Sequence, residues 1–513
     1  MSFQITPQLY EKIKHFAKFP QTAVSLRQMV MFGPRPSKGT MFKASQFLHE
    51  ELPIRLAHRV KELEELPGHL SEMPSIVRVK NWYAQSFKDL LDLPPPTLSS
   101  TMKERIKQAS RKKPYLPHHV VNPTPPPPPA HTNLHPVIPI GHRYYTNVEE
   151  IDCSPEVLTY TENFVKTIEQ IKQRHDPVVM TVAQGILEYK ELLKSNTMDT
   201  EVQQFLDRFY MSRMGIRMLI GQHSALYRDP VQKNYVGVIC TKTNIREIVK
   251  DAISNARYIC EEHYDIFKAP DVQVYCPGDI EFMYVPSHLM HMVFELLKNS
   301  LRAVVERYGK DYEDEYPPVK VAIAHGKEDI TIKISDEGGG VPRSGIPLVW
   351  TYMYTTAKRQ DIERPDEDRS DFNAPMAGFG YGLPLSRLYA RYFGGDLKLI
   401  SMEGYGTDAY LHLNRLSNSD EPLIELISIM NEDTDNVTFP TETIQAVFKN
   451  SWKESSTKAN KDSIQLSCEF LRLFTTEAVH RAAAETDRST DNESKRLMTE
   501  SLEQILPQLL LDF

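Results

Sequence analysis

Apolar residues recur at helical spacing through residues 7–92 and again from residue 155 to about Tyr227. The second stretch opens with Ser154-Pro155-Glu156, a cap residue followed by proline at the first helical position. One apolar face of the helix that follows carries Val157, Phe164, Ile168 and Ile171. These patterns predict an antiparallel helical bundle, which we assign to residues 1–235.

After Asn244 the pattern mixes strands with helices, as an α/β sandwich requires. Its clearest predicted elements are a helix over residues 288–305, two paired strands over 319–323 and 329–335, and a helix over 383–393. We assign this α/β domain to residues 236–420. The expected fold class is therefore α+β with several domains.

Two segments interrupt this order. The stretch from Pro94 to Pro139 holds 13 of the chain's 36 prolines, and proline fits neither a helix interior nor a central strand. Residues 94–142 therefore predict an extended or disordered insertion, for which a tolerated surface loop is a simpler interpretation than a polyproline-recognition site. Residues 357–377 are polar and charged, and they predict a second irregular segment.

The pattern becomes all-helical after a linker over residues 421–437. A short helix capped by Thr441, a long helix from Ser463 and a short helix from Glu500 follow one another. This order is typical of a histone fold, and we assign it to residues 438–513. From Thr441 onward the chain carries nine basic and twelve acidic residues, so this part is no strong DNA binder by itself.

Composition excludes several classes of protein. The 513 residues are enough for two or three domains, and the net charge of −8 argues against a chain built around a polyanion. Five cysteines without a Cys-x-x-Cys pair argue against a disulfide framework or a zinc site, and they favour a reducing compartment. No apolar run approaches the roughly 18 residues that a membrane helix needs. The first 20 residues contain no arginine, so a mitochondrial presequence is not evident.

Three short motifs follow one another in the α/β region. They are Glu295-Leu-Leu-Lys-Asn299 on the long helix, Asp336-Glu-Gly338-Gly-Gly340 after the second paired strand, and Gly378-Phe-Gly380-Tyr-Gly382-Leu383 at the start of the next helix. Each motif alone is ordinary: a solvated helix face, a turn or a glycine loop. In this order and at this spacing, they indicate a site that holds ATP and activates an attacking group.

Physical chemistry gives each motif a role. His291, Glu295 and Asn299 are spaced by four and share one helical face, where a carboxylate can act as a general base and an amide oxygen can bind magnesium. The Asp336 carboxylate follows a strand and precedes glycines that let a ligand approach, so it can accept the exocyclic amine of adenine. The free amides and the positive dipole end of the helix at Leu383 suit phosphate.

The three motifs resemble the N, G1 and G2 boxes of the GHKL ATP fold that gyrase, the Hsp90 chaperones, histidine kinases and MutL share. Further stretches resemble the family of mitochondrial pyruvate dehydrogenase kinases and branched-chain 2-oxo-acid dehydrogenase kinases: Glu51-Leu-Pro-Ile-Arg-Leu-Ala57, Phe205-Leu-Asp-Arg-Phe-Tyr-Met-Ser-Arg213, Ile216-Arg-Met-Leu219 and Tyr352-Met-Tyr-Thr-Thr-Ala357. The resemblance covers roughly residues 10–420. It implies a protein-serine kinase that phosphorylates and inactivates the decarboxylase subunit of a 2-oxo-acid dehydrogenase.

The resemblance also implies the catalytic and nucleotide-binding residues. Glu295 would deprotonate the substrate serine, and His291 would either tune that carboxylate or serve only in the core. Asn299 would hold Mg²⁺, so ATP and Mg²⁺ are the expected cofactors, with K⁺ as a further candidate. Residues 357–377 resemble the mobile lid over the nucleotide. The expected nucleotide-binding set is Asn299, Arg302, Asp336, Gly338, Gly340, Thr355, Thr356, Gly378, Phe379, Gly380, Tyr381, Gly382, Leu383 and Thr407.

Two further pockets are implied. Arg213 and Arg217 are spaced by four and can clamp a carboxylate. The resemblance places them with Tyr83 in a pocket where pyruvate inhibits, although a structural ion-pair face would have the same pattern. The lipoyl arm of the acyltransferase core is expected in an apolar pocket, although plain core packing would look the same. That pocket comprises Met29, Phe32, Phe47 and Leu48.

The C-terminal region departs from these kinases. No Asp-Trp tail follows Asp420-Glu-Pro-Leu423, which puts tail exchange in the expected homodimer in doubt. The ending Leu502-Glu-Gln-Ile-Leu-Pro-Gln-Leu-Leu-Leu-Asp-Phe513 closely resembles that of centromere protein X, a histone-fold subunit. This resemblance implies a partner chain like centromere protein S, and DNA as a further partner.

A kinase of the mitochondrial matrix and a nuclear histone-fold subunit belong to different compartments. Two adjacent genes read as one merged gene model explain the join more simply than a dual-purpose protein does. Every expected kinase residue lies before Leu416. We therefore expect truncation near Ser419 to leave kinase activity intact.

Other functions stay open at this point. A two-component histidine kinase needs an acceptor histidine followed by an acid, but His223 precedes serine, and His175-Asp176 precedes proline. A chaperone- or topoisomerase-type ATPase would hydrolyse ATP without a protein acceptor, and a histone-fold DNA-binding subunit would describe only the tail. Among the kinases, Tyr352-Met-Tyr354 favours a pyruvate dehydrogenase substrate, whereas the missing Asp-Trp tail favours the branched-chain complex.

Overall fold

The chain divides into two compact units, Met1–Leu423 and Ile424–Phe513. The computed structural model describes residues 3–67, 69–96, 155–193, 200–312, 315–355, 380–416, 419 and 421–422. All described residues belong to the first unit. Most of the predicted insertion, the charged segment over 357–377, most of the predicted linker and the predicted histone fold lie outside them. No helix in the described ranges is long and apolar enough to cross a membrane.

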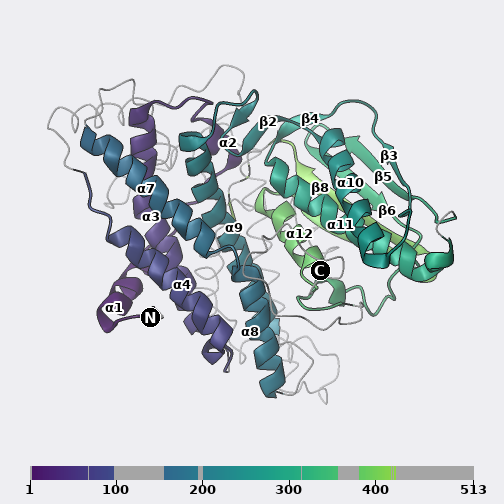
Figure 1. The fold of residues 1–513 in the computed structure, drawn as a ribbon, viewed down its shortest axis with the longest axis horizontal. Helices are drawn as coiled ribbons and strands as arrows, with labels where there is room; N and C mark the ends of the chain where they lie inside the picture. The colour runs from purple at the N-terminus through teal and green to yellow at the C-terminus, as the bar shows by residue number, and fades with distance from the viewer. Residues whose placement is uncertain are drawn as a thin grey trace, which may run out of the picture. The chain divides into compact units, whose positions relative to one another are not determined.

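The first half of this unit is helical (Figure 1). Its helices are α1 Pro7–Phe16, α2 Leu26–Val30, α3 Lys38–Glu64, η1 Leu70–Glu72, α4 Pro74–Leu91, α7 Pro155–Arg174, α8 Val178–Leu193 and α9 Thr200–Arg228. Helix α3 is central, because α1, α4, α7 and α9 all pack against it, while α8 packs on α4. The predicted helix start at residue 155 is confirmed. The apolar face of α7 is buried as the pattern predicted.

Two sheets form the second half. The three-stranded sheet has the order β1-β2-β4 and the five-stranded sheet the order β3-β5-β6-β8-β7. Their strands are β1 Tyr235–Val236, β2 Ile239–Asn244, β3 Val272–Tyr275, β4 Glu281–Tyr284, β5 Val319–His325, β6 Asp329–Ser335, β7 Asp396–Met402 and β8 Gly406–Asn414. Only the pair β3–β5 is parallel among these strands. The predicted pairing of β5 with β6 is confirmed, in a register that sets Lys320 opposite Ser335.

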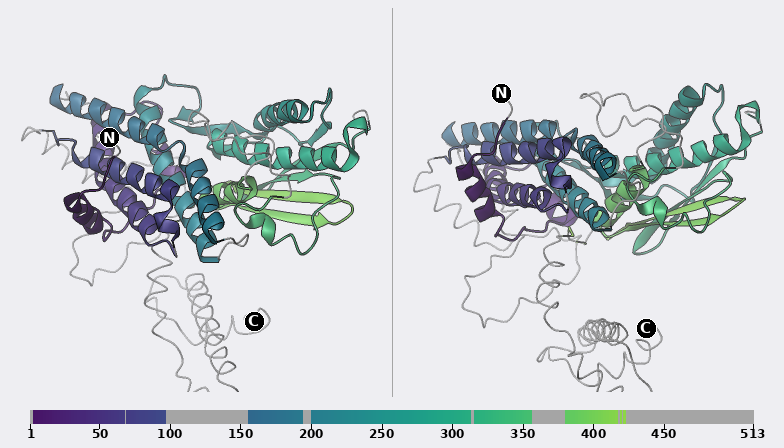
Figure 2. Two further views of the ribbon diagram at one scale, coloured as in Figure 1. Left: turned by 60° about the horizontal axis from the view of Figure 1, so that its bottom comes forward. Right: turned by 90° about the horizontal axis from the view of Figure 1, so that it is seen from below.

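Three helices cover one face of the five-stranded sheet, as Figures 1 and 2 show. These helices are α10 Ile245–Tyr264, α11 Pro286–Tyr308 and α12 Gly382–Tyr392. This half also contains two short 3-10 helices, η2 Lys310–Tyr312 and η3 Leu348–Trp350. Alternate residues of β5, β6 and β8 are buried toward these helices, which is the period-2 pattern of a half-buried strand. The observed mixture of helix and sheet agrees with the expected α+β class.

Charged residues also lie inside the helical half. Glu51, Arg55 and Arg59 of α3 are all buried, and Arg55 is 0% exposed. Arg55 pairs with Glu421, which follows the last strand of the sheet. Truncation near Ser419 would remove this carboxylate, so our expectation that such a cut is harmless has to be revised.

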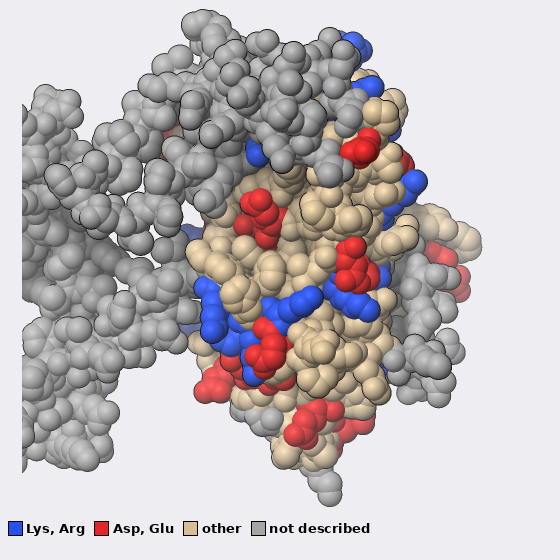
Figure 3. All heavy atoms as spheres, turned by 90° about the vertical axis from the view of Figure 1, so that its left-hand side faces the viewer, with Lys and Arg blue, Asp and Glu red and all other residues tan. Residues whose placement is uncertain are grey.

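The outer face of the helical half carries both signs of charge. Seen from that side, Lys and Arg side chains gather across the middle of the described surface, and Asp and Glu side chains lie between and beside them (Figure 3). The described residues of this face therefore form no surface of a single charge.

Candidate nucleotide and catalytic site

Helix α11 positions the candidate base. Glu295 is 5% exposed, and its Oε1 accepts a hydrogen bond of 2.8 Å from Nζ of Lys298, one turn later. Its Oε2 lies against Gly382, the first residue of α12, where an added Cβ would overlap that oxygen. The first and third motifs thus meet at one carboxylate, and only glycine leaves room for it.

His291 and Asn299 lie one turn before and one turn after Glu295 on α11. The His291 ring is 5.1 Å from the ring of Tyr389 on α12. The half-buried Asn299 amide makes no hydrogen bond to a described residue, so its oxygen is free to act as a ligand. Arg302, expected near the nucleotide, pairs with Glu306 of its own helix, with Nε 3.4 Å from Oε1.

The second motif forms a hydrogen-bonded loop at the end of β6. Two backbone amides donate to Oδ1 of Asp336, from Gly338 at 3.0 Å and from Thr407 at 3.3 Å. Burial raises the pKa of Asp336, and hydrogen bonds from Gly338, Ser300 and Thr407 oppose that rise. The structure thus brings Thr407 beside Asp336.

Close backbone packing explains the glycines of this loop. A Cβ added at Gly338 would overlap Ala303 of α11. Gly340 has a φ of +70°, and a Cβ there would overlap the carbonyl group of Met402. The loop is therefore closely packed between α11 and the β7–β8 turn.

Arg307 is a residue of this region that sequence reasoning missed. Its guanidinium donates to the carbonyl oxygens of Glu337 at 2.9 Å, Gly404 at 2.9 Å and Tyr405 at 2.5 Å. One side chain of α11 thereby ties the Asp336 loop to the β7–β8 turn. Its position two turns after Asn299 was the only signal in the sequence, and exposed arginines at such positions are common.

The described part of the third motif starts at Gly380, whereas Thr356, Gly378 and Phe379 lie outside the described residues. Gly380 has a φ of +78°, and a Cβ there would overlap the backbone of Tyr354. Thr355, from the expected nucleotide-binding set, is the next residue after Tyr354 in the chain. The residues on either side of the charged segment thus lie side by side, and Leu383 belongs to the first turn of α12.

Three tyrosine rings connect this loop to α9, and although each belongs to a motif noted in the sequence, their mutual contact was not predicted. Tyr210 of α9 lies 5.5 Å from Tyr352 and 5.9 Å from Tyr381, measured between ring centroids. The Tyr352 hydroxyl donates to Oδ1 of Asp207 at 2.6 Å, and its backbone amide donates to Gln203 at 2.9 Å. Helix α9 therefore holds both flanks of the charged segment.

The residues of the expected keto-acid pocket lie close together. Tyr83 is fully buried, and its hydroxyl has no hydrogen-bond partner among the described residues. Its ring lies 4.3 Å from that of His175, whose backbone carbonyl accepts from Arg213 at 3.1 Å. Arg217 pairs with Asp176 at 2.7 Å. Arg217 thus makes an ion pair, and Arg213 donates to the backbone of the residue whose ring lies beside Tyr83.

The residues of the expected lipoyl pocket are all buried. Met29 of α2 and Leu48 of α3 are fully buried, and Phe32 and Phe47 nearly so. The backbone carbonyl of Met29 accepts a hydrogen bond from Gln222 of α9. In this structure the four side chains belong to the core, so a lipoyl arm would have to displace part of it.

Three regions of the chain match known protein families. Residues 23–240 match the family described as mitochondrial branched-chain alpha-ketoacid dehydrogenase kinase. Residues 284–417, which contain all three motifs, match the histidine kinase-, DNA gyrase B- and HSP90-like ATPases. A third region, residues 441–513, matches CENP-S associating centromere protein X.

Similar whole proteins decide the family. A mitochondrial [pyruvate dehydrogenase (acetyl-transferring)] kinase of Schizosaccharomyces pombe is 48% identical over 81% of this chain and 98% of its own length. The chain belongs to the pyruvate dehydrogenase kinase family. The mitochondrial [pyruvate dehydrogenase (acetyl-transferring)] kinase of Arabidopsis thaliana is 42% identical over 81% of this chain and 96% of its own length. Isozyme 3 of the human kinase is 39% identical over 80% of this chain and 86% of its own length.

Membership in this kinase family agrees with the burial of the two alternative acceptor histidines. His175 and His223 are each 1% exposed, and burial lowers the pKa of both to about 3. The ring of His223 bonds to the Ser45 hydroxyl at 3.0 Å. Neither ring is placed to receive a phosphoryl group.

Proposed function

We propose that this chain is an ATP-dependent protein-serine kinase that phosphorylates, and so inactivates, the decarboxylase subunit of the pyruvate dehydrogenase complex. The observation that carries this proposal is the buried Glu295 carboxylate against Gly382, where the candidate base meets the start of a phosphate-binding helix. The similar proteins are pyruvate dehydrogenase kinases, which favours pyruvate dehydrogenase over the branched-chain complex as substrate.

In this mechanism each motif has one task. Glu295 accepts the proton of the attacking serine hydroxyl, and the backbone amides at the start of α12 bind the phosphates. The Asp336 carboxylate accepts a hydrogen bond from the exocyclic amine of adenine, and the backbone amides of Gly338 and Thr407 hold this carboxylate in place. Asn299 offers a free amide oxygen on the face of α11 that carries Glu295, which suits Mg²⁺. That ion would neutralise charge on the phosphates. K⁺ is a further candidate cofactor, which varying the K⁺ concentration in the kinase assay would test.

The decisive experiment supplies labelled ATP and Mg²⁺ together with purified pyruvate or branched-chain dehydrogenase complex. We expect label on the decarboxylase subunit of pyruvate dehydrogenase, as acid-stable phosphoserine, and loss of that complex's activity. Preferential labelling of the branched-chain subunit would assign the alternative substrate. ATP hydrolysis without a labelled protein would instead indicate an ATPase.

We further propose that Tyr83, Arg213 and Arg217 bind a keto-acid inhibitor. The positive charges of Arg213, Arg59 and Arg217 all act on the Tyr83 hydroxyl, although burial dominates and raises its pKa to about 12. A buried, unpartnered hydroxyl among guanidinium groups suits a small carboxylate. Because His175 has a pKa of about 3, we expect inhibition without a titration between pH 6 and 8.

The test compares Arg217→Gln with Arg228→Gln, at the end of the same helix. Pyruvate should inhibit the first variant at least about tenfold more weakly, because one lost charge-assisted contact is worth about 1.5–3 kcal/mol. The second should respond like the unaltered kinase. Equal inhibition of both variants would exclude this pocket.

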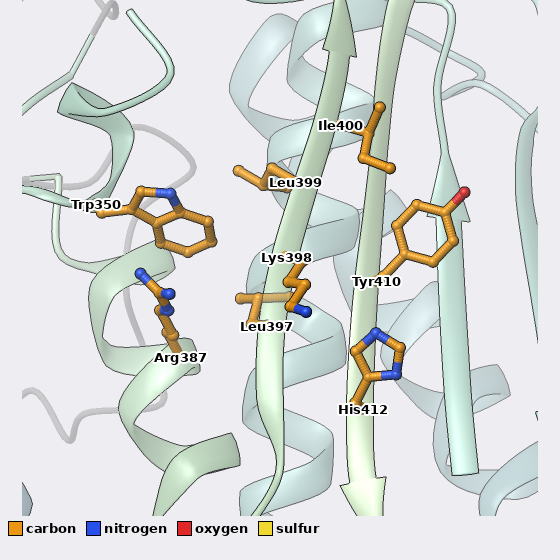
Figure 4. Close-up of a pocket in the computed structure, with 8 residues that line it drawn as sticks. All are labelled: Trp350, Arg387, Leu397, Lys398, Leu399, Ile400, Tyr410 and His412. Carbon is orange, nitrogen blue, oxygen red and sulfur yellow. The ribbon is translucent and has the colours of Figure 1, made fainter. Parts of the chain in front are cut away.

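We propose that a second copy of the chain covers the outer side of the sheet at β7. Ile400 is 60% exposed and Met402 64% exposed on this strand. Ile400 also lines a hollow of about 380 Å³ (Figure 4). In it, the Arg387 guanidinium lies 4.5 Å from the Trp350 ring.

Sedimentation of Ile400→Glu should show monomers. The control is Tyr258→Glu on α10, a similarly exposed residue over the other face of the sheet, which should leave the dimer intact.

We propose the remaining assignments on the family match. Residues 1–235 form the antiparallel bundle that receives the lipoyl domain, residues 236–420 the kinase domain, and the protein works in the mitochondrial matrix. Replacing Phe32 by Ala should weaken lipoyl-domain binding, measured by calorimetry, with little change in ATP affinity. Unchanged binding would return these apolar residues to a purely structural role.

For residues 438–513 we propose a histone fold that pairs with a chain like centromere protein S, in the nucleus if separately expressed and with DNA as a further ligand. The match of residues 441–513 to centromere protein X supports this proposal. Transcript sequencing across residues 421–437 tests the merged gene model. One continuous message together with a single polypeptide on a blot would establish a genuine fusion.

A further inference from the structure

The chain returns to the helical half directly after the last strand of the sheet. Beyond β8, the Ser419 hydroxyl accepts a hydrogen bond of 2.7 Å from the Asn414 side chain. A Cβ added at Gly394, after α12, would overlap this hydroxyl. Two residues later Glu421 is 5% exposed, an unusual burial for a carboxylate outside any helix or strand.

Arg55 of α3 receives this carboxylate. Its Nη1 and Nη2 donate to Oε1 and Oε2 of Glu421 at 2.7 and 2.8 Å, a two-pronged pair. Its Nε donates to Glu51 at 2.9 Å, and Nη2 also donates to the carbonyl of Thr22 at 2.7 Å. Burial would lower the pKa of Arg55, but the charges of Glu421 and Glu51 overcome it and raise that pKa. The arginine is thus fully engaged and fully charged.

A glycine in the middle of α9 makes room for the pair. A Cβ added at Gly215 would overlap Oε1 of Glu421 and come within 2.8 Å of Nη1 of Arg55. Glycine in a helix interior costs roughly 1 kcal/mol relative to alanine, so its presence needs a packing reason. Gly221 on the same helix has no such neighbour, because only Val238 comes within 4 Å, at 3.9 Å.

We propose that Ser419 and Glu421 act as a strap that locks α9 against the ATP-binding half, with Glu421 as a positioning residue for phosphotransfer. The inference rests on the proposed kinase function. Helix α9 is held at Gly215 by the strap, and it holds Tyr352 through Asp207 and Gln203. The Asp336 loop has its contacts within the ATP-binding half. Losing the strap should therefore slow phosphate transfer more than it weakens adenine binding.

The experiment uses the full chain with two variants and two matched controls. Glu421→Gln keeps the shape and removes the charge, and Gly215→Ala inserts a methyl group where the carboxylate sits. Glu201→Gln, at an exposed position of α9, and Gly221→Ala are the controls. Turnover on the dehydrogenase complex and the Kd of a fluorescent ATP analogue are measured about 15 °C below the Tm of each variant.

We expect Glu421→Gln to lower kcat at least about tenfold and to change the nucleotide Kd less than threefold. Its Tm should fall by at least about 4 °C, since a buried arginine loses its main partner. Glu421→Asp, which keeps the charge but shortens the reach, should recover part of kcat. Unchanged kcat in Glu421→Gln, or an equal loss of nucleotide affinity, would overturn the positioning role.

Hydrogen exchange separates failure of the strap from failure of the proposed kinase function. Even if the unaltered chain phosphorylates no dehydrogenase, Glu421→Gln should speed amide exchange in α9 around Gly215 and in residues 350–352. Exchange in the β5–β6 pair should stay unchanged. Unaltered exchange in α9 would refute the strap whatever the substrate of the enzyme proves to be.

Discussion

At the scale of single residues, two buried carboxylates are held in different ways. The Glu295 carboxylate accepts a hydrogen bond from the ammonium group of Lys298 and lies against Gly382 at the start of α12. Asp336 is held by two backbone amides. Side chains and a helix start thus hold the first carboxylate, whereas the backbone holds the second.

Replacing Glu295 by Gln should abolish phosphotransfer and keep ATP affinity within a few-fold. The change removes the base and very little volume, and general-base catalysis contributes about 10² to 10⁴ in rate. Single-turnover transfer of labelled phosphate measures the loss, with Glu262→Gln on the exposed side of α10 as the control. Near-normal turnover in Glu295→Gln would remove it from the catalytic role.

Replacing Asp336 by Ala should weaken ATP binding by about 1–3 kcal/mol, because a buried adenine amine would lose its acceptor. Equilibrium titration with a fluorescent ATP analogue measures the change, and Asp311→Ala, at an exposed position, provides the control. An unchanged Kd would mean that the Asp336 loop is only a turn.

At the scale of elements, the glycines of the motifs mark contacts between secondary structures. Gly338 packs on α11, Gly340 on the β7–β8 turn, and Gly382 on the Glu295 carboxylate. The distances between motifs along the chain therefore reflect the elements that must intervene. This is why three ordinary motifs become informative together.

Gly382→Ala tests that reading of the third motif. The new methyl group would overlap Oε2 of Glu295, so we expect the carboxylate to rotate away and kcat to fall at least about tenfold. Gly278→Ala is the matched control, since nothing lies within 4 Å of a Cβ there. A Gly382→Ala enzyme as active as Gly278→Ala would disprove the contact.

At the scale of the whole molecule, buried histidines tie stability to pH. Burial lowers the pKa of His175, His223 and His288 to about 3 in the folded chain, whereas the unfolded value lies near 6.5. Above that pH both states hold these rings neutral. Below it only the unfolded state takes up protons, so the free energy of unfolding falls as the pH is lowered.

We therefore expect denaturant midpoints to drop steadily from pH 7 to pH 5, a range above the titration of ordinary carboxylates. Each histidine contributes a slope of at most about 1.4 kcal/mol per pH unit. Replacing His223 by Gln should reduce the slope, whereas His69→Gln, at an exposed site, should not. A flat profile between pH 7 and 5 would show that these rings can be protonated in the folded state.

Much of this molecule was readable from local patterns. Apolar spacing predicted the helix that carries Glu295 and the strand pair before Asp336, because each segment buries one face. The order of the three motifs pointed to an ATP site, and the similar proteins place the chain in the kinase family. The assignments that fall on residues 423–513 and 357–377 stay predictions.

The sequence by itself determined the elements, the motifs and the family, because these depend on residues near one another in the chain. Only the tertiary structure decided which distant residues meet. It showed Arg307 clamping two loops and Tyr352 held by Asp207. It also extended the compact unit past Ser419, because Glu421 pairs with an arginine 366 residues earlier. No local pattern records such a pair, since a buried charge is stable only where the fold supplies its partner.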